Sequence, residues 1–167
     1  MGAIKLIITA WLAVFLQSAA IHYLGVWGNM PDLITLAVAG YTLRSGGARG
    51  MAFGALTGFL ADCYRPDTMG ILTLSGITVG WLAGVLRERI YREHPLSQMV
   101  LAGGLVLIRQ PFEFLGTAGG SLTAYPWFLI RHGLGSALYT SLLAYWLLPL
   151  ISRWLQRNQN PRLSHKL

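Results

Sequence analysis

Four ionisable side chains lie inside apolar stretches of this chain, and they carry most of its potential for chemistry: Asp62, Arg109, Glu113 and Arg131. Each would cost about 2.5–3.5 kcal/mol if it faced lipid at the middle of a bilayer, so we expect them to form an inward-facing intramembrane polar cluster. Arg109 and Glu113 are spaced i, i+4, which places both on one helix face at ion-pair distance. Two interpretations stay open: a structural knot that fixes helix register, or a site for an anionic solute, a lipid headgroup or a partner helix.

Catalytic and metal chemistry have little support in the remaining polar residues. Asp62 has no second intramembrane aspartate for a paired-carboxylate protease. Neither Ser75 nor Ser121 has a convincing nucleophile setting with His132. The four histidines show no metal-ligand spacing, and Cys63 is the only cysteine. We expect no enzymatic activity, no cofactor and no metal.

Glycines recur at four-residue spacing in two neighbouring apolar stretches. The first row ends on Asp62 and contains Gly46, Gly50, Gly54 and Gly58, and the second contains Gly76, Gly80 and Gly84. Helices in lipid associate through close backbone contact along rows of small residues. The rows therefore predict a tight pair of helices, with packing as the principal role of these glycines, and they do not form a phosphate-binding loop.

The elements that must position these residues follow from hydropathy. The chain has 167 residues, of which 54% are hydrophobic and only 11% are charged, roughly half the charge content of a soluble domain. This composition excludes disorder and argues against a soluble fold. Six apolar runs are candidate membrane spans, at about 4–25, 30–43, 49–64, 68–86, 97–116 and 126–150. We expect an all-α integral membrane protein, with a six-helix transmembrane domain over residues 1–150 and a basic cytoplasmic tail over 151–167.

Charge sets the orientation of these spans, because cytoplasmic loops retain lysine and arginine. If every run crosses, one side receives Lys5, Arg44, Arg49, Arg87, Arg89, Arg92, Arg153, Arg157, Arg162 and Lys166. The other side receives only Arg65. We therefore predict that both termini are cytoplasmic and that the polar cluster lies in the outer half. The net charge of +7 is then a topology signal, and no nucleic-acid partner is expected.

The first run also has the small residues of a signal-peptide cleavage site, at Ser18-Ala19-Ala20. We expect it to be retained as a helix, because the apolar run continues beyond that site to Val26.

Several motifs in the middle of the chain resemble the bacterial rod shape-determining protein MreD family. They are Pro31-Asp32-Leu33, Gly50-x-x-x-Gly54-x-x-x-Gly58-x-x-x-Asp62 and Thr68-Met69-Gly70-Ile71-Leu72. The resemblance implies a non-enzymatic, multi-pass component of the inner membrane that supports cell elongation and lateral peptidoglycan synthesis. It implies binding to MreC, indirect work with MreB, RodA and a class B penicillin-binding transpeptidase, and contact with membrane lipid. It also implies a groove for a partner's transmembrane helix, shaped by Gly54, Gly58, Asp62 and Gly70.

That family is similar in fold to the substrate-binding membrane subunits of energy-coupling-factor vitamin transporters. A second hypothesis is therefore a solute-binding subunit, whose ligand site would be lined by Asp62, Arg109, Glu113 and Arg131. The last three of these residues match no motif of the MreD family, so they fit either hypothesis.

Overall fold

The computed structural model describes residues 3–23, 29–65, 69–87, 95–117, 123 and 125–156. In that part of the chain the elements are α1 (Ala3–Tyr23), α2 (Leu33–Ser45), α3 (Gly47–Cys63), α4 (Ile71–Arg87), α5 (Pro95–Thr117), α6 (Tyr125–Phe128), the π-helical turn η3 (Leu129–Gly133) and α7 (Leu134–Gln156). Because α6, η3 and α7 follow one another directly, six long helical segments result. The all-helical prediction is confirmed, and each of the six apolar runs corresponds to one segment.

Several helix ends differ from the expected ones, among them the start of α2 and the end of the last helix. Helix α2 begins at Leu33 and not at residue 30, because Pro31 lacks a backbone N–H and Asp32 acts as the N-cap. The last helix continues to Gln156, six residues beyond the end of the last apolar run at residue 150.

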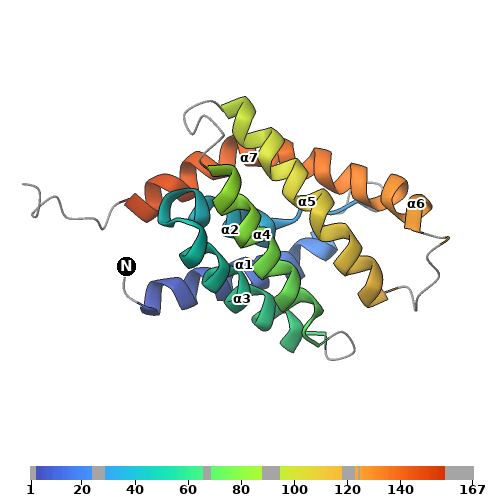
Figure 1. The fold of residues 1–167 in the computed structure, drawn as a ribbon, viewed down its shortest axis with the longest axis horizontal. Helices are drawn as coiled ribbons and strands as arrows, with labels where there is room; N and C mark the ends of the chain where they lie inside the picture. The colour runs from blue at the N-terminus through green and yellow to red at the C-terminus, as the bar shows by residue number, and fades with distance from the viewer. Residues whose placement is uncertain are drawn as a thin grey trace, which may run out of the picture.

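The helices run back and forth, so that their ends gather on two sides of the molecule. The N-terminal end of α1, the α2–α3 turn and the C-terminal end of α7 lie toward the left in Figure 1, whereas α3 and α5 end toward the bottom and right. An even number of passes produces this arrangement, in which α1 begins and α7 ends on the same side of the molecule.

Apolar surface faces outward on several helices. Two described segments are long and apolar enough to cross a membrane, Leu96–Gly116 and Tyr125–Ile151. Large exposed apolar side chains include Trp11 and Phe15 on α1, Trp81 on α4, and Leu138 on α7. Such extensive outward apolar surface is typical of proteins that contact lipid or other proteins.

Helix α2 is the central element of the bundle. It contacts α1, α3, α4, α5 and α7, and its residues from Ile34 to Leu43 are all buried. This burial explains how a helix of only 13 residues is held in place. A short helix wrapped by longer ones positions its N-terminal end, with Asp32, inside the protein.

Helices α3 and α4 form a tight hairpin along the two glycine rows. A Cβ atom on Gly54 would lie 2.6 Å from the carbonyl carbon of Gly76, and one on Gly80 would lie 2.6 Å from that of Gly50. Only hydrogen fits at these positions, so the predicted tight pair is confirmed. Gly46 is an exception, because it turns the chain between α2 and α3 with φ +93° and its place in the seam is taken by Gly47.

Candidate functional site

A buried ion pair joins α5 to the start of α2. An Nη1 nitrogen of Arg109 lies 2.9 Å from Oδ1 of Asp32, and both side chains are more than nine-tenths buried. The same nitrogen donates to the hydroxyl of Thr35 at 3.3 Å. A buried arginine is tolerated when a carboxylate and further acceptors satisfy it. This ion pair therefore fixes the position of α5 relative to α2.

The entry into α2 is stabilised by side chains from two other helices, α1 and α7. The Gln17 amide of α1 donates to the carbonyl of Pro31 at 3.0 Å and accepts from the N–H of Leu33 at 2.7 Å. The N–H of Asp32 donates to the hydroxyl of Thr140 on α7 at 2.9 Å. Because backbone polar groups inside an apolar bundle must be paired, these contacts allow a non-helical segment to lie buried here.

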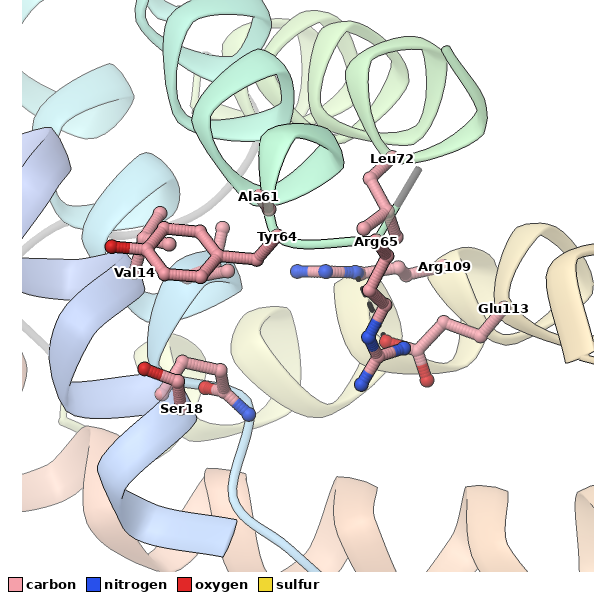
Figure 2. Close-up of a pocket in the computed structure, with 10 residues that line it drawn as sticks. Val14, Ser18, Ala61, Tyr64, Arg65, Leu72, Arg109 and Glu113 are labelled. Carbon is pink, nitrogen blue, oxygen red and sulfur yellow. Dashed lines mark ion pairs between the residues drawn. The ribbon is translucent and has the colours of Figure 1, made fainter. Parts of the chain in front are cut away.

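Glu113 extends this polar group toward the surface. Its Oε1 lies 3.4 Å from Nε of Arg109, one helical turn earlier, so the predicted i, i+4 ion pair is confirmed. Figure 2 shows Arg109 pointing from α5 into the space beside α3, with the guanidinium of Arg65 next to the Glu113 carboxylate. These residues line a cavity of about 80 Å³ between α1, α3 and α5.

Asp62, at the C-terminal end of the glycine row of α3, accepts hydrogen bonds from the first turn of α4. Its Oδ1 accepts from the N–H of Leu72 at 3.1 Å, and its Oδ2 accepts from the N–H and the hydroxyl of Thr73 at 2.9 and 2.6 Å. The residue before α4 is Gly70, with φ +94° and no side chain that could cap the helix. Asp62 of α3 therefore caps α4 from across the hairpin, which stabilises the exposed backbone donors of its first turn.

Three of the four residues expected to form the polar cluster lie near one another. Arg109 and Glu113 form an ion pair, and the Asp62 carboxylate interacts electrostatically with Arg109 while its oxygens accept the hydrogen bonds that cap α4. Arg131 lies in the π-helical turn η3 with an exposed side chain, and within the described residues it makes no ion pair with the other three. The wider turn of a π-helix changes which residues face the interior.

The residues expected to shape a partner groove are divided. Gly54 and Gly58 face α4 within the hairpin, and a Cβ on Gly58 would lie 2.6 Å from the Cα of Thr73. The face on which they lie is therefore already covered, and a large residue at Gly58 would separate the hairpin before it could affect a partner. Asp62 and Gly70, in contrast, line an open hollow.

This outer hollow lies on the surface of the hairpin and has a volume of about 410 Å³. Its lining is mostly apolar and consists of Phe59, Asp62, Met69, Gly70, Thr73, Leu74 and Ile77. A Cβ on Gly70 would meet nothing within 4 Å, so the hollow is open there. Phe59, Met69 and Leu74 each expose more than half of their surface.

A family model of the rod shape-determining protein MreD matches residues 2–158. The chain belongs to the MreD family. No curated protein and no solved structure matches it. Membership assigns this MreD-family chain to rod shape determination.

Sequence reasoning identified Asp32 in this MreD-family chain without pairing it with Arg109, and it missed Gln17 and Thr140, which contact the same buried segment. The signal for Asp32 was present, because an aspartate that follows a proline and precedes an apolar run is a typical N-cap. No local pattern connects it with Arg109, which lies 77 residues later. Among the described residues, no three histidine, cysteine, aspartate or glutamate side chains gather as a metal site would require.

Proposed function

We propose that this MreD-family protein is a non-enzymatic scaffold of the bacterial cell-elongation machinery and that it binds the transmembrane helix of MreC at the outer hollow. Family membership supports a role in rod shape, and the outer hollow supports the place of binding. The single observation that carries the proposal is this open, apolar depression on an otherwise tightly packed hairpin.

The hairpin has the properties that a helix-docking surface needs. Its glycine seam brings the backbones of α3 and α4 into contact, which makes the pair rigid, and the Asp62 cap fixes the start of α4. Transmembrane helices recognise one another by close packing against such preformed shapes. A helix that enters the hollow would contact Phe59 on one side and Leu74 on the other.

The same proposal includes the setting of the protein. All six helical segments cross the inner membrane, both termini lie in the cytoplasm, and the hollow lies toward the periplasm. Through MreC, the scaffold would position MreB filaments on the cytoplasmic side relative to RodA and a class B penicillin-binding transpeptidase. The residues near the periplasmic side include Arg65, the only arginine between the runs on that side.

The alternative of a vitamin-binding transport subunit has less support from the dimensions of the polar cavity. The cavity beside Arg109 and Glu113 measures about 80 Å³. Small-molecule sites usually enclose about 300–1,000 Å³. The Arg109 guanidinium also forms ion pairs with Asp32 and Glu113, so its positive charge is already balanced within the protein.

Co-purification with MreC tests the scaffold proposal. Leu74→Trp places a larger side chain in the outer hollow. Because the Leu74 side chain is 56% exposed, we expect this substitution to leave the fold unchanged. Leu138→Trp is the matched control, because Leu138 is 67% exposed and lies on α7. We expect Leu74→Trp to reduce the amount of MreC recovered at least several-fold and Leu138→Trp to leave it unchanged. Equal recovery of MreC with both variants, at wild-type thermal stability, would rule out the outer hollow as the docking site.

A further inference from the structure

Three arginines gather where α2 ends, α3 begins and α4 ends. Arg44 lies in the last turn of α2, Arg49 in the first turn of α3, and Arg87 at the C-terminal end of α4. Gly46 joins the first two helices, and Nη1 of Arg87 lies 3.1 Å from the point that a Cβ on Gly46 would occupy. The Arg87 guanidinium therefore lies over the α2–α3 turn. We call Arg44, Arg49 and Arg87 the arginine patch.

The positive charge of the arginine patch is not balanced by a nearby carboxylate in the described structure. The described structure contains three carboxylates, and each lies at the end of its helix that is distant from the arginine patch: Asp32, Asp62 and Glu113. No member of the patch makes an ion pair within the described residues, and the Nε atom of Arg87 is buried without a hydrogen-bond partner. In the sequence, residues 88–94 add two arginines and two glutamates, so their formal charges cancel.

The surroundings of the patch are apolar on the exposed side of α4. Trp81 and Val85 expose about half of their surface there, within two turns of Arg87. A ligand with an anionic head and an apolar body would match both features. Arginine suits a phosphate head, because its planar guanidinium donates two parallel hydrogen bonds to phosphate oxygens.

We propose that the arginine patch binds the phosphate headgroup of an anionic phospholipid, whose acyl chains lie against Trp81 and Val85. This inference is independent of the outer hollow, which lies at the other end of the hairpin. Basic clusters at helix ends attract anionic lipid, and each arginine near a membrane surface strengthens this attraction by about fivefold.

Thermal unfolding of the purified, delipidated full chain in an uncharged detergent tests the proposal. We expect phosphatidylglycerol to raise the melting temperature at concentrations where phosphatidylcholine and inorganic phosphate do not. The double variant Arg44→Gln/Arg49→Gln changes two exposed side chains and should require roughly 25-fold more phosphatidylglycerol for the same shift. Arg131→Gln is the control, since Arg131 is exposed on η3, outside the patch, and its response should match that of the wild type.

A second measurement uses the unaltered protein and needs no variant. Because exposed charges are screened by salt, the shift produced by phosphatidylglycerol should shrink as sodium chloride is raised. The proposal would be overturned if phosphatidylglycerol raised the melting temperature of the double variant as much as that of the wild type. It would also be overturned if Arg131→Gln weakened this stabilisation as much as the double variant does. Stabilisation by phosphatidylcholine to the same extent would refute a charge-selective site, and stabilisation by inorganic phosphate alone would refute a lipid.

Discussion

Replacement of Gly54 by alanine should separate the α3–α4 hairpin. The added Cβ would lie 2.6 Å from the carbonyl carbon of Gly76, whereas ordinary contacts begin near 3.4 Å, and the obstacle is backbone that cannot rotate away. Overpacking of this kind costs about 1–3 kcal/mol. Alanine recovers about 0.5–1 kcal/mol as the better helix former. We therefore expect a net loss of about 1 kcal/mol, which corresponds to a melting temperature lower by roughly 2–4 °C in a chain of this size.

Gly104→Ala provides the control for that experiment. Gly104 lies within α5, and a Cβ there would meet nothing within 4 Å, so only the gain in helix propensity applies. We expect the melting temperature of this variant to equal or slightly exceed that of the wild type. The reasoning is refuted if Gly54→Ala melts at the same temperature as Gly104→Ala, because the close backbone contact would then carry no energetic weight.

Three further experiments test the cap of α4, the buried ion pair and the proposed topology. Asp62→Ala should cost about 1–3 kcal/mol and should speed hydrogen exchange at the first turn of α4, because two backbone donors lose their acceptor; exchange at the wild-type rate would contradict the capping role. Arg109→Met should cost about 3–5 kcal/mol by leaving Asp32 buried without its partner, and the double variant Asp32→Asn/Arg109→Met should cost less than the two single changes together; strictly additive costs would disprove the coupling. A membrane-impermeant maleimide should label the exposed Cys63 in cells whose outer membrane is permeabilised and whose inner membrane is intact. Labelling only after the inner membrane is permeabilised would contradict the proposed topology.

The helical elements could be predicted from the sequence because their signals are local. Each apolar run carries its own hydropathy, and the four-residue glycine spacing specifies a close helix pair whatever the surrounding fold is. The Arg109–Glu113 pair follows in the same way from i, i+4 geometry within one helix. Only the ends moved, where a cap such as Asp32 decides the first residue.

The composition of the candidate site could not be predicted because it depends on contacts between distant segments. Arg109 contacts Asp32 because α2 packs against α5 and α7 in the folded bundle, and the periodicity of the sequence contains no information about that packing. Asp62 lies on the glycine row, but its capping role depends on the neighbouring helix α4, which follows a glycine and so has no side chain of its own at the cap position. Arg131 faces outward within a π-helical turn, which a pattern of 3.6 residues per turn does not anticipate.

Site-specific photo-cross-linking in growing cells tests the scaffold proposal most directly. A photoreactive amino acid at Leu74, in the outer hollow, should form a covalent adduct with MreC, whereas the same amino acid at the exposed Leu138 of α7 should not. An MreC adduct from position 138 with none from position 74 would contradict the proposal that MreC docks in the outer hollow.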